Sequence, residues 1–296
     1  MPAFRKALAS ALLASFVCSA ANAAGEPVPP CEQCAAWNES QSPFRLYGNS
    51  WYVGTHRLGS ILITSDTGHV LIDGALAESA PKIAANIRAL GFKVEDIKVI
   101  LNTHDHYDHA GGIAELQRLS GARVLASPPS AKVLEAGEPG PDDPQFGILQ
   151  PIAKVPHVSP LKDGGTVSVG PLAIVAHFTP GHTAGGTSWT WKSCEGTRCL
   201  NMVYADSLTP VSAPKFRFTG NTRLLSQFEK SYEALEALPC DILITPHPEI
   251  SNLWERLERR ESQGNRDALL ETSACDMYVE ASRERLRKRL AQESAN

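Results

Sequence analysis

The segment Thr103-His104-Asp105-His106-Tyr107-Asp108-His109 decides how this sequence is interpreted. It follows the apolar run Ile97–Leu101 and directly precedes Gly111-Gly112, so we predict a strand that runs into a loop and then into a helix. Imidazole nitrogens and carboxylate oxygens are the usual zinc ligands of hydrolytic sites. The run His104-x-His106-x-Asp108-His109 offers more ligands than one catalytic zinc needs, so its spacing indicates two metals.

The alternative interpretation of this segment is a chelating tract on the protein surface. Surface tracts of that kind are usually low in complexity, whereas this segment is mixed and follows a strand that looks buried. We therefore favour a metal site.

Composition and the N-terminus indicate an exported globular protein. The chain has 296 residues, of which 43% are hydrophobic and 20% charged. Residues 1–23 are typical of a secretory signal peptide, because Arg5 and Lys6 precede an apolar core that ends in the small-x-small cleavage site Ala21-Asn22-Ala23. We expect this segment to be removed, the protein to be periplasmic, and residues 24–296 to form one domain.

The charge balance argues against nucleic acid and membranes as partners. Without Arg5 and Lys6, the 28 Lys and Arg residues fall to 26 against 32 Asp and Glu, a formal net charge of −6. Such a chain has little attraction for nucleic acid or anionic lipid, and we interpret the basic run at 283–289 as the solvated face of a terminal helix. No apolar stretch besides the signal is long enough to cross a bilayer. We expect a monomer that acts on a small molecule.

Six cysteines follow the predicted signal: Cys31, Cys34, Cys194, Cys199, Cys240 and Cys275. An even number in an exported chain suggests disulfides, although six cysteines allow 15 connectivities. Proximity favours Cys194–Cys199 across a hairpin turn, which leaves Cys240–Cys275 as a long-range bridge and Cys31–Cys34 as the remaining pair. The rival for the last pair is a zinc site, but only His56 lies nearby in the sequence to complete it.

The remaining pattern predicts an α/β fold. Strands are expected at residues 44–46, 51–54, 60–64, 70–73, 94–101, 123–126, 166–169, 172–178, 186–191, 201–205 and 241–245, and helices at 77–90, 112–119, 223–238, 252–260 and 267–290. Residues 137–150 are rich in Gly, Pro and Asp and are predicted to be a long loop near the site. Strands followed by helices, twice over, predict two sheets packed face to face with helices outside.

Two further histidines stand where apolar strands are expected to end. His182 lies in Thr179-Pro180-Gly181-His182-Thr183, and His247 lies in Thr245-Pro246-His247-Pro248. Because side chains at neighbouring strand ends can converge, we expect both to be metal ligands. The other four histidines, His56, His69, His157 and His177, are expected not to be ligands.

The His104-x-His106-x-Asp108-His109 run, with His182 and His247 downstream, resembles the metallo-β-lactamase superfamily. That resemblance implies an αββα sandwich of two mixed sheets with the metals at one edge. The chain is similar in particular to subclass B3 metallo-β-lactamases, especially the AIM/SMB-type carbapenemases. The stretches that carry this similarity are Tyr47-Gly48-Asn49, Trp51-Tyr52-Val53-Gly54-Thr55, Asp143-Pro144-Gln145-Phe146-Gly147, Tyr204-Ala205-Asp206-Ser207-Leu208 and Thr245-Pro246-His247-Pro248.

The resemblance also implies roles for individual residues. A first zinc would be held by His104, His106 and His182, and a second by Asp108, His109 and His247. Ser207 and Thr209 would hydrogen-bond the substrate carboxylate, and Gln145 would touch substrate side groups. Ser207 stands where subclass B1 relatives use a cysteine ligand, and Pro210 follows Thr209 in a region where many relatives carry a lysine. A Cys240–Cys275 disulfide is implied as well.

The resemblance further implies hydrolysis of the β-lactam amide of penicillins, cephalosporins and carbapenems, which would confer antibiotic resistance. Two zinc ions about 3.5–4 Å apart can share a hydroxide that attacks the lactam carbonyl. Asp108, besides binding the second zinc, is expected to orient this nucleophile.

Two rival functions remain at this stage. The first is another hydrolase of the superfamily, such as a glyoxalase-II-like thioesterase or a lactonase, in which Asp206 would bridge the metals. Export and disulfides favour the lactamase, because glutathione thioester chemistry belongs mainly in the cytosol. The second is an exported zinc-binding module without catalysis. Lost ligands would be its signature, and none of the six ligands expected in this sequence is missing.

Overall fold

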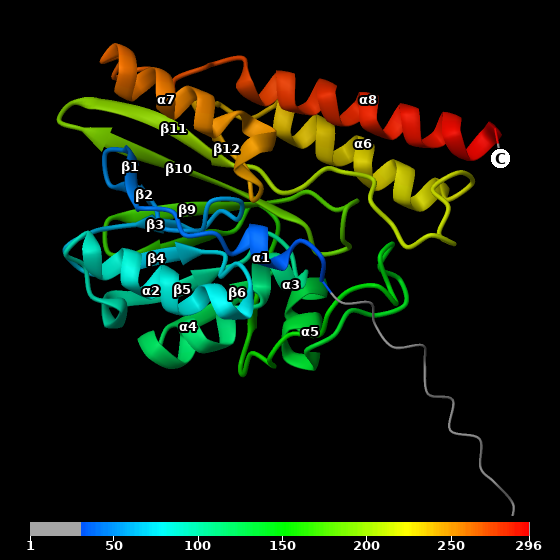
Figure 1. Cartoon of the computed structure of the whole chain (residues 1–296), viewed down its shortest axis with the longest axis horizontal. Helices are drawn as coiled ribbons and strands as arrows, with labels where there is room; N and C mark the ends of the chain where they lie inside the picture. Colours follow the sequence, from blue (N-terminus) through cyan, green and yellow to red (C-terminus); the bar gives the residue numbers. More distant parts are fainter. Residues whose placement is uncertain (1–30, 296) are drawn as a thin grey trace, which may run out of the picture.

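The computed structural model describes residues 31–295, which form two β-sheets stacked face to face with helices on both outer faces (Figure 1). The predicted signal peptide, residues 1–23, lies outside the described residues. Within residues 31–295, no helix has both the length and the apolar character needed to span a bilayer.

The first sheet contains seven strands in the order in which they occur along the chain. β1 to β4 pair antiparallel, whereas β4 to β7 pair in parallel, so the sheet is mixed. The strands are β1 (Phe44–Tyr47), β2 (Ser50–Tyr52), β3 (Ile61–Ile63), β4 (His69–Ile72), β5 (Ile97–Leu101), β6 (Arg123–Ala126) and β7 (Ser159–Pro160).

The second sheet contains five strands in the order β12-β11-β10-β9-β8. Only the pairing of β11 with β12 is parallel, so this sheet is mixed too. The strands are β8 (Thr166–Val169), β9 (Leu172–Phe178), β10 (Thr187–Glu195), β11 (Arg198–Tyr204) and β12 (Ile242–Ile244).

The helices cover the two outer faces: α2, α4 and α5 lie against the first sheet, and α6, α7 and α8 lie on the side of the second (Figure 1). The α-helices are α1 (Cys34–Trp37), α2 (Ala80–Ala89), α3 (Tyr107–Ala110), α4 (Ile113–Ser120), α5 (Pro128–Ala136), α6 (Thr222–Glu236), α7 (Leu253–Gln263) and α8 (Ala274–Ala295). Short 3-10 helices occur at Ala77–Ser79, Val94–Asp96 and Pro248–Ser251.

Three apolar cores hold these layers together. The central core lies between the sheets and includes the fully buried Trp189, Tyr52 and Tyr204. The second joins the first sheet to α2, α4 and α5, and the third joins the second sheet to α6 and α8. This arrangement confirms the predicted αββα sandwich.

Several local predictions differ from the structure. Residues 267–290 were expected to form one helix, but α8 begins only at Ala274. The preceding segment looks helical because Ala268 and Leu269 are both buried, yet the Leu269 carbonyl accepts a hydrogen bond from the buried Arg256 guanidinium instead of closing a helical turn. The expected strand at 94–101 begins with a 3-10 turn, and α5 and β7 were not predicted at all.

Three disulfides join the six described cysteines in the pairs Cys31–Cys34, Cys194–Cys199 and Cys240–Cys275. Cys194 and Cys199 face each other across the β10–β11 ladder. Cys240, just before β12, is tied to Cys275 in the first turn of α8. The rival zinc site at Cys31 and Cys34 is thereby excluded in this structure.

Candidate metal centre

Three histidines from both sheets meet at one edge of the sandwich, and we call His104, His106 and His182 the first cluster. His104 and His106 follow β5, whereas His182 follows β9 of the other sheet. The three imidazole ring centroids lie 4.9 Å apart in every pairing. One ligand atom from each residue lies within 4.8 Å of the others, which is close enough for one metal ion.

Asp108, His109 and His247 form a second cluster beside the first. Asp108 and His109 lie on the single helical turn α3, so the predicted loop is shorter than expected. Asp108 Oδ2 lies 3.0 Å from His109 Nε2 and 3.3 Å from His247 Nε2. The His104 and His109 rings are 4.4 Å apart, which places the two clusters side by side.

Oxygen atoms behind the first cluster orient its rings. Asp206 Oδ1 lies 2.8 Å from His104 Nδ1, and Asp143 Oδ2 lies 3.0 Å from His106 Nε2. The Thr209 carbonyl lies 2.8 Å from His182 Nδ1. An imidazole that donates one N–H to such an oxygen directs the lone pair of its other nitrogen at a metal.

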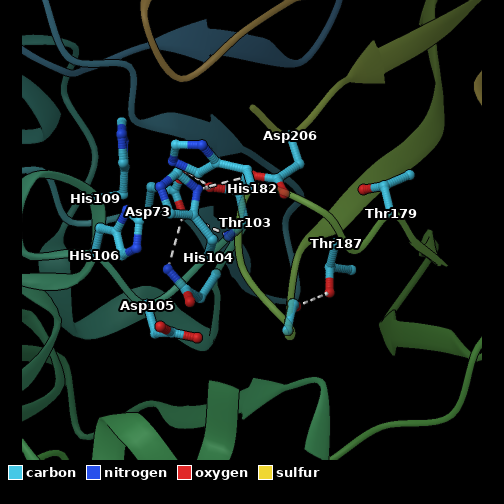
Figure 2. A network of polar contacts seen from close by, with 12 residues as sticks. Asp73, Thr103, His104, Asp105, His106, His109, Thr179, His182, Thr187 and Asp206 are labelled. Carbon is cyan, nitrogen blue, oxygen red and sulfur yellow. Dashed lines mark hydrogen bonds and ion pairs between the residues drawn. The ribbon is translucent and has the colours of Figure 1, made fainter. Parts of the chain in front are cut away.

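The unpartnered nitrogens fit a metal at this place. His104 Nε2 and His109 Nδ1 are buried and have no hydrogen-bond partner among the described residues. A buried polar atom without a partner is destabilising by itself. Figure 2 shows the labelled histidines gathered around a common point with Asp206 beside them. These atoms therefore have the position and the chemistry of metal ligands.

The protonation states of His104, His182 and Asp108 also suit a cation. Burial lowers the pKa of His104 well below its ordinary value, and the nearby His109 and His182 rings lower it further. Burial and the neighbouring His106 lower the pKa of His182 to about 3. Burial raises the pKa of Asp108, but His109 and His247 outweigh it and hold that pKa well below its usual range. Neutral imidazoles and an ionised carboxylate are the forms that bind metal.

Asp206, the residue suspected of bridging two metals, lies behind His104. It is fully buried, and none of the three groups of described residues that could hold a metal includes it. The backbone of Gly186 packs closely against the Asp206 carboxylate, because a Cβ atom added at Gly186 would lie only 2.4 Å from Asp206 Oδ2. Asp206 is therefore placed to orient a ligand.

The three predicted substrate residues border the clusters. Ser207 is buried next to Asp206, and the Thr209 hydroxyl lies 3.2 Å from His182 Nδ1. Gln145 Nε2 lies 3.4 Å from His106 Nδ1. His56, His69, His157 and His177, which were expected not to be ligands, are absent from the metal-binding groups of the described residues. His247 is absent from these groups too, and it joins the second cluster through its contact with Asp108 and the His109 ring, whose centroid lies 4.8 Å away.

Sequence reasoning missed two supporting carboxylates, Asp73 and Asp143. Asp73 follows β4 and accepts hydrogen bonds from the Thr103 amide at 2.7 Å and the Thr103 hydroxyl at 2.8 Å, which fixes the start of the histidine segment. Burial raises the pKa of Asp73 to about 7, against the effect of these bonds. Its position at a strand end is the signal that also marked His182 and His247.

Comparison with solved structures identifies the family. Over 90% of this chain and 100% of the other, the protein is 56% identical to the Rm3 metallo-β-lactamase, with a TM-score of 0.87. It is 49% identical to MEM-A1, a subclass B3 metallo-β-lactamase from a soil metagenome library, over 88% of this chain and 99% of the other, with a TM-score of 0.85. The chain belongs to the metallo-β-lactamase superfamily. The predicted similarity to subclass B3 is thus confirmed, and structures of SMB-1 match as well.

Two sequence comparisons agree with this assignment. The model of the metallo-β-lactamase superfamily matches residues 60–196. A curated hydroxyacylglutathione hydrolase from Bradyrhizobium sp. (strain ORS 278) is 33% identical over 129 residues, which are 44% of this chain and 42% of that protein. The chain thus matches less than half the length of this curated relative. The relatives named here are hydrolases, which agrees with the expectation of an enzyme.

Proposed function

We propose that this protein hydrolyses the amide bond of β-lactams at a centre of two zinc ions. His104, His106 and His182 would hold the first zinc, and Asp108, His109 and His247 the second. The observation that carries the proposal is the convergence of these six side chains, from both sheets, with buried ring nitrogens left unpartnered. Solved relatives that match nearly along their whole length and are named metallo-β-lactamases support the choice of substrate.

When bound, zinc supplies Lewis acidity and lowers the pKa of water to about 7. The protein's own residues would position the reactants. Asp206 and Asp143 hold the His104 and His106 rings in place, and Asp108 orients the nucleophile. The Thr209 hydroxyl, which lies 3.2 Å from His182 Nδ1, would bind the substrate carboxylate together with Ser207. Gln145, next to His106, would contact substrate side groups.

The direct test is a hydrolysis assay on purified protein with a penicillin, a cephalosporin and a carbapenem. We expect turnover that disappears with a chelator and returns with zinc. Protein that holds two zinc ions and hydrolyses none of these compounds would contradict the proposal and would favour a binding module without catalysis.

The second candidate is a glutathione thioesterase, which the curated hydroxyacylglutathione hydrolases suggest. The match to the relative from Bradyrhizobium sp. extends over 42% of its length, and Asp206 contacts His104 Nδ1. Assaying a hydroxyacylglutathione beside the β-lactams separates the two functions. We expect kcat/KM to be higher for a β-lactam, and the reverse order would favour the thioesterase.

Export to the periplasm, a single domain and a monomeric state stay predictions. Cell fractionation would test export, and we expect a mature chain that begins after Ala23 or Ala24. Size-exclusion chromatography with light scattering would test the monomer, whose mature mass should lie below the 31.9 kDa of the whole chain.

A further inference from the structure

The chain between β11 and α6, residues 207–221, borders the metal centre and has no regular secondary structure; we call it the 207–221 loop. Its first residues are fixed near the clusters. The Thr209 carbonyl contacts His182 Nδ1, and the Leu208 amide donates a 3.0 Å hydrogen bond to the Tyr278 hydroxyl of α8. Both residues with a proposed role in carboxylate binding, Ser207 and Thr209, therefore lie at its start.

The far part of the loop is held by the last turns of α8. The Glu293 carboxylate is 93% buried and accepts hydrogen bonds from the backbone amides of Phe218 at 3.1 Å and Thr219 at 2.8 Å. Arg289 Nε donates to the same carboxylate at 2.7 Å. A buried carboxylate bound to loop amides stabilises the loop only while these bonds persist.

Arg289 extends the attachment to the middle of the loop. Its guanidinium donates to the Ser212 hydroxyl at 2.8 Å and to the Phe216 carbonyl at 3.2 Å. It also lies over the Phe218 ring, 5.3 Å from the centroid. One pair of side chains on α8 thus contacts the loop at four successive places.

The 207–221 loop in turn contacts the loop at 137–150. The Ala213 amide donates a 2.8 Å hydrogen bond to the Pro144 carbonyl. Pro144 lies between Asp143, which orients His106, and Gln145, whose side chain faces His106. A conformational change at the 207–221 loop would therefore reach both proposed substrate-contacting segments.

We propose that Arg289 and Glu293 are positioning residues that hold the 207–221 loop in its substrate-binding conformation. This inference rests on the proposed function. A loop without regular secondary structure loses conformational entropy for every residue that is ordered, so it needs attachments to stay in one conformation. When only a fraction of molecules is competent to bind, the apparent dissociation constant rises by the inverse of that fraction. Loosening the loop should thus raise KM more than it lowers kcat.

The test compares Glu293→Ala and Glu293→Gln with Arg287→Ala as a matched control. Arg287 lies on the same helix, and its exposed side chain pairs only with glutamates of α8 among the described contacts. We expect Glu293→Ala to raise KM for a β-lactam about tenfold, with kcat within about twofold and zinc content unchanged. Glu293→Gln should have a smaller effect in the same direction, and it serves as the test if the alanine variant does not fold.

Amide hydrogen exchange measures the attachment without any substrate. We expect faster exchange at Phe218 and Thr219, and faster trypsin cleavage after Lys215, in both Glu293 variants but not in Arg287→Ala. Unchanged exchange, or faster exchange with unchanged KM, would overturn the inference, as would an equal loss of kcat and zinc. Wild-type protein that hydrolyses no β-lactam, with faster exchange in the variants, would overturn the proposed function while still supporting attachment of the loop.

Discussion

The two clusters of the metal centre differ in how the rest of the protein supports them. In the first cluster each histidine has an oxygen behind it, supplied by Asp206, Asp143 or the Thr209 carbonyl. In the second cluster, the carboxylate that contacts the His109 and His247 rings belongs to Asp108, itself a proposed ligand. Histidine rings that are hydrogen-bonded to an oxygen on the side away from the metal are pre-organised for binding. The first cluster should therefore bind zinc more tightly than the second.

Exposure distinguishes His247 from the other histidines of the centre. The His104, His106 and His109 side chains are 1%, 3% and 1% exposed, whereas the His247 side chain is 19% exposed. Its ring packs against Trp37 of the short helix α1, with centroids 5.7 Å apart. The second cluster is thus open to solvent at His247.

The largest expected effect comes from removing a ligand of the second cluster. His247→Ala should lower zinc content from two ions to about one per chain, and weaken the second position by more than about 100-fold, beyond the loss typical of a supporting residue. Metal analysis after dialysis against buffers of known free zinc measures this. Equal loss from both positions would refute the ligand assignment.

Removing a supporting carboxylate should act on the first cluster with a smaller effect. Asp206→Asn and Asp143→Asn should each weaken zinc binding at the first cluster by about 10–100-fold. The reason is that the His104 ring loses its fixed orientation in the first variant and the His106 ring in the second. The exposed Asp66 provides the control Asp66→Asn. Competition with a chromophoric chelator gives the affinities, and a variant that loses zinc from the second position alone would break the comparison.

In the zinc-free protein, acid should act in opposite directions on His182 of the first cluster and His247 of the second. The pKa of His182 falls to about 3 on folding, because of burial and the neighbouring His106. The folded protein therefore favours the neutral form of His182. The contribution of His182 to the free energy of unfolding is fully present above pH 6.5 and is lost as the pH falls from 6.5 towards 3. Burial lowers the pKa of His247, but Asp108 outweighs it and raises that pKa, so its contribution is present below pH 6.5 and lost on going above its raised pKa.

Thermal unfolding of the apo protein at pH 7 and pH 5 tests this difference. His182→Asn should reduce the loss of stability between these pH values by about 2 kcal/mol, whereas His247→Asn should make the loss larger. If both variants change the loss in the same direction, the pKa values of His182 and His247 do not shift in opposite directions on folding.

Much of the fold, and the convergence of the residues proposed as ligands, was predictable because the signals are local. The His104–His109 segment is contiguous, and His182 and His247 share a Thr-Pro context at strand ends. The termini of α5 carry local signals too, Ser127 before Pro128 and Gly137 after Ala136, and the helix was nevertheless missed. The start of α8 was beyond local signals, because it depends on a hydrogen bond from Arg256 in another helix.

The supporting residues could not be predicted from the sequence for a related reason. Asp143 lies in a loop directly after another aspartate, Asp142, and only the folded chain selects it as the partner of His106. The same holds for Glu293, which sits in a strongly charged helix where an exposed position was the simplest expectation. Its burial against Phe218 and Thr219 arises from the path of a loop more than 70 residues earlier.

The central claim is that six side chains from both sheets hold two zinc ions at one edge of the sandwich. A crystal structure of the zinc-loaded protein, with anomalous data collected on both sides of the zinc absorption edge, tests it most directly. Two zinc peaks are predicted, one bound by His104, His106 and His182 and the other by Asp108, His109 and His247. A single peak at full zinc loading, or a peak bound by Asp206, would contradict the account.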